Sequence, residues 1–507
     1  MQNWKFYKST RCEGRMNGPV DKCKLLSPVW AATIFMLMIF AGCAAVGPDY
    51  VPPDASSPAS WHSRLKNGRV GGEEDSCALA RWWTTLNDPV LSSLVDRAVI
   101  GNLDLREAKA RVREARARRG LSKSEMFPTL DVSGSATKSR SNHEESELYS
   151  TAFDAGWELD LFGGVRRAVE AAEADLQAGR EDLHNVLVTL TAEVVLNYVE
   201  LRMYQGQLAT TGENLRLQRE TYELTQWRYE AGLDDELSVQ QARYSMESTR
   251  SQIPTLRSAE EESKNRIAVL LGKQPGMLHK ELEFQAPIPV APPEIAVGIP
   301  ADMLRRRPDV RKAERELAAQ TARIGEATAD LYPRFKLTGS IGLQSDELSG
   351  LFKSTGSFWS IGPGISWNIF DAGAVRRNIE IQSAQQEQYL NAYEAAVLNA
   401  LEEVENALVA YAEEQNRRNS LNEAVHAAQR AVELSRIKYR AGMIDFVNLL
   451  ETERSLLSYQ NELVQSHGNV ASNLVRLYKA LGGGWETQAT EIENESKDRE
   501  NDNGKKA

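Results

Sequence analysis

The stretch LVTLTAEVVLNYVELRMYQGQLATTGENLRLQRETYELTQWRYE, residues 187–230, decides the fold. Apolar or aromatic side chains stand at every seventh position of this stretch: Leu187, Val194, Leu201, Leu208, Leu215, Tyr222 and Tyr229. A sustained seven-residue step is typical of a left-handed coiled-coil seam. No proline occurs from Gly164 to Glu230. The sequence therefore predicts a single helix over 164–230, about 100 Å long, which no compact domain requires.

The same pattern recurs 210 residues further along the chain. The equivalent positions are Val397, Val404, Tyr411, Arg418, Val425, Val432 and Tyr439, and Arg418 alone breaks the apolar series. The turn RYEAGLDDELSVQQ at 228–241 is likewise matched by KYRAGMIDFVNLLE at 438–451. Glycine supplies the left-handed conformation that ends a helix. We therefore expect each rod to end at an Ala-Gly pair, Ala231-Gly232 or Ala441-Gly442, and a shorter helix to run back.

Other segments show that most of the chain consists of two repeated halves. Residues 104–128 match 309–333 at an offset of 205, and 157–167 match 367–377 at an offset of 210. The predicted organisation is a signal peptide (1–42), an extended segment (43–85), a first repeat (86–285, with a β-hairpin at 129–162 and a helical hairpin at 164–271), a proline-rich linker (286–300), a second repeat (301–485, with a β-hairpin at 334–370 and a helical hairpin at 374–481) and a disordered polar tail (486–507).

The two predicted β-hairpins alternate apolar and polar residues with a period of two, which is typical of strands. Each run has about 10–13 residues, the length that a tilted strand needs to cross a bilayer. A soluble hairpin covering a core has the same pattern, so the period alone leaves both readings open. Pro128 and Pro333 mark the points where a helix gives way to a strand, because proline disfavours a continuing helix. Pro363 is unusual within a strand.

The N-terminus has the pattern of a targeting segment. Six basic residues precede the apolar run 27–42, which is short for a membrane span and has the flanks of a signal peptide. The basic stretch is long, so Met1 and Met16 both remain candidate starts. The run ends in FAGC, which resembles a bacterial lipoprotein cleavage box with Cys43 as the acylated residue, although Phe40 stands where leucine is usual. Ordinary signal cleavage nearby is the alternative. The other cysteines lie in the signal peptide or would carry the lipid, so Cys77 has no partner. No disulfide framework is therefore expected.

Charge and motifs exclude several classes of function. The net charge of −11 argues against a nucleic-acid-binding protein, which needs a basic face. The six histidines are scattered without the spacing of metal ligands, and the chain has neither a phosphate loop nor a nucleophile elbow. We therefore expect no enzyme, no catalytic or metal site and no cofactor.

The predicted strands and helices together limit how the protein can assemble. Four strands cannot close a transmembrane barrel, since the smallest known barrels have eight. Open strand edges in lipid leave backbone groups unpaired at a cost of several kcal/mol each. If these strands cross a membrane, several chains must share one barrel, and three chains would supply twelve strands. The rods would then continue the barrel as a tube through an aqueous compartment.

At this point the sequence resembles the outer membrane factors, the TolC-like ducts, in the lipoprotein branch that serves resistance-nodulation-division pumps. The motifs that carry the resemblance are CAAVGPDYVPP (43–53), WWTTLNDPVLSSLVDRAVIGNLDLREAKARVREARA (82–117), GIPADMLRRRPDVRKAE (298–314) and KYRAGMIDFVNLLETERS (438–455). The resemblance implies an α+β membrane protein: a homotrimer with a 12-stranded barrel, a periplasmic α-helical tunnel and a small mixed equatorial region. It also implies insertion in outer membrane lipid, with a periplasmic adaptor and an inner-membrane pump as partners.

The resemblance further implies roles for the repeated turns. They would be the periplasmic tips of the tunnel, where Ala231, Gly232, Ala441 and Gly442 contact the adaptor. The positions that match the family's gate are Lys438, Tyr439 and Glu451, with Asn448 where some members carry a second acid and with Arg228, Tyr229 and Gln241 as first-half equivalents. A solvated helix end with ordinary surface charges is the plain alternative. The leading expectation is a duct for small molecules, and the alternatives are a duct for secreted proteins or a lipid-anchored scaffold without a pore.

Overall fold

The computed structural model describes residues 45–54, 58, 60–62, 69–70, 79–141, 144–289, 296–297, 300–353 and 356–485. The predictions for the signal peptide, for Cys43 and Cys77 and for the polar tail lie outside these residues.

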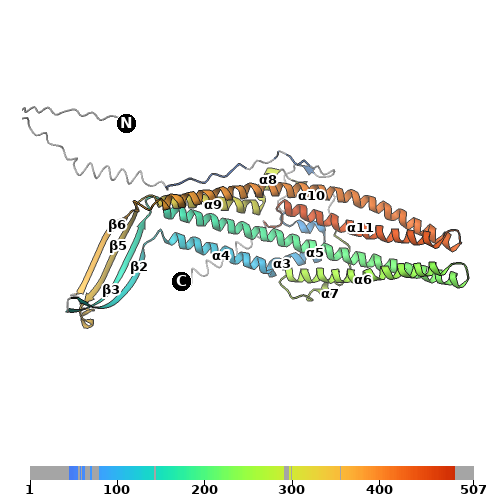
Figure 1. Cartoon of the computed structure of the whole chain (residues 1–507), viewed down its shortest axis with the longest axis horizontal. Coiled ribbons are helices and arrows are strands. Elements are labelled where there is room, and N and C mark those ends of the chain that lie inside the picture. Colours follow the sequence, from blue (N-terminus) through green and yellow to red (C-terminus); the bar gives the residue numbers. More distant parts are fainter. Residues whose placement is uncertain are drawn as a thin grey trace, which may run out of the picture.

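The molecule is elongated, with a β-sheet at one end and two helical hairpins that reach the opposite end side by side (Figure 1). The long helices are α5 (Gly164–Glu230) and α10 (Ala374–Arg440), each of 67 residues. Helices α6 (Glu236–Leu270) and α11 (Phe446–Ala480) run back along them, and each has 35 residues. The remaining helical elements are η1 (Trp82–Leu86), α3 (Pro89–Gly101), α4 (Leu103–Ser124), α7 (His279–Leu282), α8 (Pro300–Arg306), α9 (Pro308–Ala329) and η2 (Leu348–Gly350).

The sheet contains β2 (Thr129–Ser141), β3 (Glu144–Leu159), β5 (Arg334–Ser345) and β6 (Ser357–Ser366), paired antiparallel in that order. Strands β2 and β6 are therefore its two edges. One row across the sheet carries Val132, Phe153, Ile341 and Trp359, and the adjacent row carries Asp131, Asp154, Ser340 and Ser360. Because neighbouring positions on a strand point to opposite faces, one face of the sheet is apolar here and the other polar.

Two predictions from the sequence need correction, one about the end of the second β-hairpin and one about the linker. The second β-hairpin was expected to extend to residue 370, but its last strand, β6, ends at Ser366. Pro363 lies within β6, opposite Leu337, so the proline does not prevent strand formation at this position.

The linker 286–300 was expected to contain no regular element. Instead, its residues Ala296–Val297 form strand β4, which pairs in parallel with β1 (Arg69–Val70), and α8 begins at Pro300. Proline count alone could not reveal this pairing, because the partner strand is more than two hundred residues away in sequence.

The main core lies where the two halves meet, near the middle of the long helices. Fully buried side chains there include Trp82, Trp83, Leu94 and Tyr198 from the first half, and Leu474 from the second. Burial of such large apolar side chains stabilises the fold by roughly 1.5–3 kcal/mol each. This core fixes the two hairpins to each other at about mid-length.

Equivalent residues of the two repeats close equivalent junctions. The Asn102 amide donates a hydrogen bond to the Leu270 carbonyl at 3.0 Å, and the Arg307 guanidinium donates to the Ala480 carbonyl at 2.8 Å. In each half the residue before α4 or α9 thus satisfies a carbonyl at the end of the returning helix, one of the groups that lack a partner within the helix.

The predicted heptad seam is confirmed on α10 and wrong on the distal half of α5. On α10 every predicted position except Arg418 is buried. On α5, Leu187, Val194 and Leu201 are fully buried, but Tyr229 is 43% exposed. The residues buried there instead are Thr211, Asn214, Gln218, Thr221 and Thr225. Each of the seven heptad positions recurs every seven residues. The period therefore could not show which of these positions pack against the neighbouring helix.

Candidate functional site: the hairpin tips and the sheet–helix junction

Each hairpin turns at a glycine with left-handed backbone geometry. Gly232 has φ +71° and Gly442 has φ +70°. The amide of the following residue bonds back to the helix, from Leu233 to the Arg228 carbonyl at 2.8 Å and from Met443 to the Lys438 carbonyl at 2.9 Å. This is the Schellman pattern, and it shows why both turns need glycine.

A buried polar network joins the two hairpins at these tips. The Tyr439 hydroxyl on α10 donates to Oδ2 of Asp234, in the turn after α5, at 2.5 Å. Nε of Arg228 donates to the same oxygen at 2.8 Å, and its guanidinium carbon lies 4.8 Å from the centre of the Tyr439 ring. Oγ1 of Thr225 lies 3.2 Å from the same hydroxyl. One carboxylate of the first hairpin therefore holds an aromatic side chain of the second.

Burial and charge shift the titration of this network. Desolvation and the neighbouring Asp234 carboxylate raise the pKa of Tyr439 to about 12. The hydrogen bond to Asp234 is the main cause that raises the pKa of Arg228. The network therefore keeps one protonation pattern, a neutral tyrosine and a charged arginine, throughout the physiological pH range.

Apolar side chains of both hairpins enclose the Tyr439 ring. Phe446 meets it edge-on with ring centres 5.8 Å apart, and Leu449, Leu450 and Ala242 complete the cluster. Enclosure of this kind lowers the local dielectric and strengthens the hydrogen bond to Asp234.

One helical turn further from the tip, a second buried network links the hairpins. Oε1 of Glu453 on α11 accepts bonds from Thr221 on α5 at 2.8 Å and from Nη2 of Arg436 on α10 at 2.8 Å. Burial raises the pKa of the Glu453 carboxyl, while the Arg436 guanidinium opposes that rise. No local sequence pattern distinguishes Glu453 from the other acids of α11, because its burial depends on packing against another hairpin.

The structure brings together some of the predicted gate residues and separates others. Arg228 and Tyr439 contact each other as described. The remaining predicted gate residues lie apart from this network: Lys438, Asn448, Glu451 and Tyr229 are exposed, and Gln241 is half-buried. Asp234 was missed. Its equivalent in the second repeat is Ile444. This difference between the two repeats was the sequence feature that could have pointed to Asp234.

Exposed apolar side chains surround the turns. They come from both hairpins: Trp227, Leu233, Leu237, Ile437, Met443 and Val447. Ala231, Gly232, Ala441 and Gly442 are exposed among them. Contiguous exposed apolar side chains are typical of a protein-binding surface.

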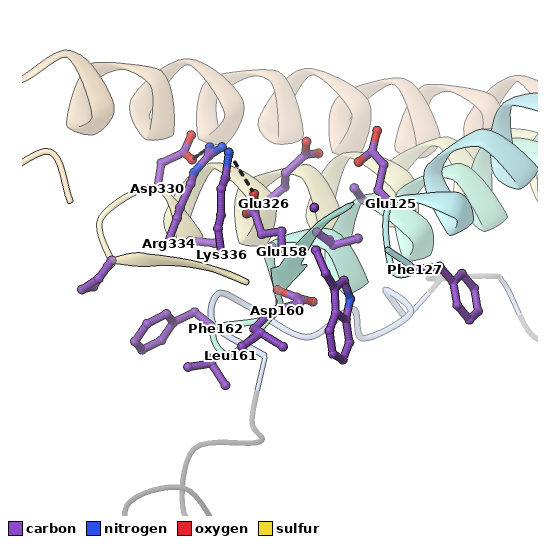
Figure 2. Close-up of a pocket in the computed structure, with 18 of the residues that line it drawn as sticks. Glu125, Phe127, Glu158, Asp160, Leu161, Phe162, Glu326, Asp330, Arg334 and Lys336 are labelled. Atoms are coloured by element: carbon purple, nitrogen blue, oxygen red, sulfur yellow. Dashed lines mark hydrogen bonds and ion pairs between the residues drawn. The ribbon is translucent and has the colours of Figure 1, made fainter. Parts of the chain in front are cut away.

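At the opposite end, a cavity of about 470 Å³ lies where the strands meet the helices. Figure 2 shows acidic side chains from three parts of the chain around it, including Glu125 directly after α4, Glu158 on β3 and Glu326 on α9. Two basic residues of β5 also line it: Arg334 pairs with Asp330 at 2.5 Å, and Lys336 lies 3.9 Å from Glu158. Acidic residues thus outnumber basic ones among the charged side chains that line the cavity.

Two equivalent tryptophans fix the strands to the helices at this junction. Nε1 of Trp157 donates to the Met126 carbonyl at 3.0 Å, and Nε1 of Trp367 donates to the Leu331 carbonyl at 3.1 Å. Each acceptor stands two residues before a predicted junction proline, Pro128 or Pro333. Strands β2 and β5 begin directly after these prolines.

The N-terminal segment is bound at the same junction. The Val46 amide donates to the Phe162 carbonyl at 3.0 Å, and buried Arg167 on α5 donates to the Val46 carbonyl at 3.1 Å and pairs with Asp49 at 2.7 Å. A Cβ on Gly47 would lie 2.4 Å from Cα of Gly325 on α9, so no larger residue fits there.

Two other kinds of feature are absent from the described part of the chain. None of its helices is long and apolar enough to cross a membrane. None of its histidine, cysteine, aspartate and glutamate side chains gather in threes as a metal site requires.

Known proteins share this architecture over nearly the whole chain. A family model described as outer membrane efflux protein matches residues 94–273 and 299–483, once for each repeat. Nodulation protein T of Rhizobium leguminosarum bv. trifolii is 35% identical over 464 residues, which cover 89% of this chain and 97% of that protein. The toluene efflux pump outer membrane protein TtgI of Pseudomonas putida is 31% identical, covering 89% and 97%.

Among solved structures, the outer-membrane channel OprN superposes with a TM-score of 0.81 at 37% identity, covering 87% of this chain and 100% of that one. The chain belongs to the outer membrane efflux protein family.

Proposed function

We propose that this chain is the outer membrane channel of a tripartite efflux system. It receives small molecules from an inner-membrane pump of resistance-nodulation-division type, through a periplasmic adaptor, and conducts them passively across the periplasm and outer membrane. The observation that carries this proposal is a four-stranded sheet joined to two helices of 67 residues, in a member of the outer membrane efflux protein family.

The channel is a homotrimer. Strands β2 and β6 are edges of the described sheet, and an unpaired edge in lipid costs several kcal/mol for each free backbone group. Three copies of four strands give twelve, enough to enclose a water-filled lumen. The row of Val132, Phe153, Ile341 and Trp359 then faces lipid, and the row that contains Asp131 and Asp154 faces the lumen.

We propose that Cys43 carries the lipid anchor. Val46 is bonded at the end of the sheet, and Cys43 precedes it by three residues, which span at most about 11 Å of extended chain. Acyl chains on Cys43 would therefore enter the membrane leaflet beside the barrel. Mass spectrometry of the mature N-terminal peptide tests this, and an unmodified peptide would contradict it.

The tips form the gate and the adaptor-contacting surface. The bonds of Tyr439 and Arg228 to Asp234 keep the two hairpins of a protomer together. The exposed Lys438 and Glu451 are free to face the axis of the trimer, where pairs across protomers would contribute only about 0–1 kcal/mol each. Contact of the adaptor with the apolar tip residues then suffices to shift the balance towards opening.

No single cargo is proposed, because the relatives with similar sequences carry names that refer to nodulation and to toluene. Two measurements test the channel itself. The purified full chain should migrate as a trimer that resists detergent and dissociates on heating, and it should conduct ions in a planar bilayer. A monomer without conductance would reject the proposal in favour of a lipid-anchored scaffold.

A further inference from the structure

Close to the sheet, four helices pack side by side in one layer. Helix α4 packs on α5, α5 on α9 and α9 on α10, so α4 and α10 are the two outer helices of this layer (Figure 1). Each outer helix has one side that points away from the layer. On both helices that side carries a regular pattern of small, apolar and charged residues.

The free side of α4 alternates small or apolar residues with arginines. These residues recur at steps of three and four positions, which is the spacing of packed positions in a coiled coil. We name this row the basic stripe: Leu103, Arg106, Ala110, Arg113 and Ala117. All five are exposed, Leu103 to 63%. Because Leu105, Ala108 and Val112 are buried on the side that packs on α5, the stripe lies on the opposite side of the helix.

The free side of α10 has the same spacing, with acids in place of arginines. We name this row the acidic stripe: Ala384, Glu387, Asn391, Glu394 and Leu398. All five are exposed, Leu398 to 65%. A different side of α10 packs on α9, where Nε2 of Gln386 donates to Oγ1 of Thr321 at 2.9 Å. No basic residue occurs from Asn378 to Asn416, so this part of α10 carries only negative charges.

The charged side chains of the two stripes have no ion pair or hydrogen bond within the described chain. Other arginines of α4 are paired within the helix, Arg111 with Glu107 at 2.6 Å and Arg118 with Glu114 at 2.7 Å. The stripe charges are therefore available to a partner of opposite charge outside the chain.

The two stripes match in charge when they run in opposite directions. Helix α4 ends at the sheet and α10 begins there, so an α4 and an α10 that lie side by side are antiparallel. Counted from the sheet ends of the two helices, Arg113 and Glu387 lie 11 and 13 residues away, and Arg106 and Glu394 lie 18 and 20 residues away. Each arginine is thus within about 3 Å, along the helix axis, of the level of one glutamate.

The uncharged residues of the stripes match as well. Between the two charged levels Ala110 lies opposite Asn391, and these short side chains let the two helices approach closely. At the end far from the sheet Leu103 lies opposite Leu398, so pairing would remove two largely exposed leucines from water. Within one chain the two stripes point away from each other. Only a second copy of the chain can bring them together.

We propose that the basic stripe of one chain packs against the acidic stripe of the next copy, and that this order of charges selects which chains assemble into one ring. Ion pairs at an exposed interface contribute little net affinity, but like charges placed opposite each other repel. Selectivity therefore comes mainly from the rejection of chains with another order of charges. The inference rests on the proposed homotrimer and adds the rule by which its members are chosen.

The first test exchanges the charges in the full-length chain. Arg106→Glu with Arg113→Glu places acids opposite acids, and the yield of detergent-resistant trimer should decrease at least tenfold. Addition of Glu387→Arg and Glu394→Arg restores opposite charges, so this swapped chain should again form trimers. When the swapped and unmodified chains carry different affinity tags and are co-expressed, mixed trimers should be at least fivefold rarer than random mixing gives.

Arg111→Glu with Arg118→Glu is the matched control. It makes the same change of charge, at the same seven-residue spacing, on residues of α4 that lie outside the basic stripe. This variant should form trimers and mix with the unmodified chain in the random proportion. Random mixing of the swapped and unmodified chains would overturn the proposal. So would a swapped chain that recovers none of the trimer lost in Arg106→Glu with Arg113→Glu.

The second test measures which positions face each other and leaves every charge in place. In a Cys77→Ser background, Ala110→Cys with Asn391→Cys should form disulfides between chains on mild oxidation and yield covalent trimers. The control Ala117→Cys with Asn391→Cys displaces one cysteine by seven residues, about 10 Å along the helix, and should cross-link at least tenfold more slowly. Equal rates for the two pairs, or no cross-link in either, would reject the matched stripes.

Failure of this inference can be distinguished from failure of the proposed channel. A monomer from the unmodified chain would reject the homotrimer itself. A conducting trimer whose swapped and unmodified forms mix at random would leave the channel intact and reject only the selection by charge.

Discussion

The hydroxyl of Tyr439 lies 2.5 Å from Oδ2 of Asp234, and this bond joins the end of one long helix to the turn that follows the other. The two residues are 205 positions apart in the chain. Tyr439 is completely buried although it stands two residues before an exposed turn. A short, enclosed hydrogen bond to a carboxylate is among the stronger contacts that a helix tip can form.

Removal of this hydroxyl should favour the open channel. Tyr439→Phe keeps the ring in its apolar pocket and deletes the bond, which is worth about 1.5–3 kcal/mol when the partner is charged. Such a loss shifts the balance between closed and open forms by roughly tenfold or more. Single-channel recording of the purified trimer should show a correspondingly higher open probability.

The repeat provides the matched control for that experiment. Tyr229 occupies the equivalent position of the first half but is 43% exposed. Tyr229→Phe should therefore leave the open probability unchanged. If both tyrosine variants behave alike, burial against Asp234 is not what closes the channel.

Glu451 should influence which ions pass. It is exposed near the tip, so three copies around an axis would concentrate cations there. Glu451→Gln should reduce the ratio of cation to anion permeability, measured from reversal potentials in a salt gradient. Asn448→Asp should increase the same ratio by adding a second acid. Unchanged reversal potentials in both variants would place these side chains away from the conduction path.

Glycine at the turn should be needed for its backbone conformation, and not because a side chain would clash with neighbouring atoms. A Cβ at Gly442 would meet no atom within 4 Å, but the φ of +70° disfavours any residue with a side chain. Gly442→Ala should lower the free energy of unfolding by about 1 kcal/mol. Gly212→Ala, within α5 and equally unobstructed, should instead raise it by about 0.5–1 kcal/mol. Chemical denaturation of the trimer compares the two directly.

Glu453 should make stability depend on pH. Burial raises the pKa of its carboxyl above the value in the unfolded chain, so the folded state binds a proton more tightly than the unfolded state. The associated stability is present at low pH and is lost as the pH rises through the folded pKa. Glu453→Gln should remove this loss.

The unfolding midpoint of the Glu453→Gln protein, relative to the unmodified chain, should therefore increase as the buffer is changed from acidic to neutral pH. Glu451→Gln, an exposed change two residues earlier, should show no such trend. A constant difference between Glu453→Gln and the unmodified chain at all pH values would contradict the assigned burial effect.

Much of the fold could be predicted from local patterns. The absence of proline and the seven-residue step predicted a helix over 164–230, and α5 has those bounds. The Ala-Gly pairs marked both turns, because a left-handed residue ends a helix regardless of its surroundings. The strand period placed four strands, although β6 stops at Ser366, before the predicted end of the fourth strand.

The candidate site was predictable only in part. Arg228 and Tyr439 were identified through the family's motif, but Asp234 was not, since its role depends on a helix from the other repeat. The pairing of Ala296 with Arg69 was missed for the same reason.

The sequence by itself determined the periodic elements, their lengths and their duplication, because these follow from interactions between residues a few positions apart. Tertiary structure alone decided which face of α5 is buried, and with it the burial of polar residues such as Thr211 and Gln218 on that helix and of Glu453. Those outcomes depend on the second hairpin, which lies some two hundred residues away in the chain and beside the first in space.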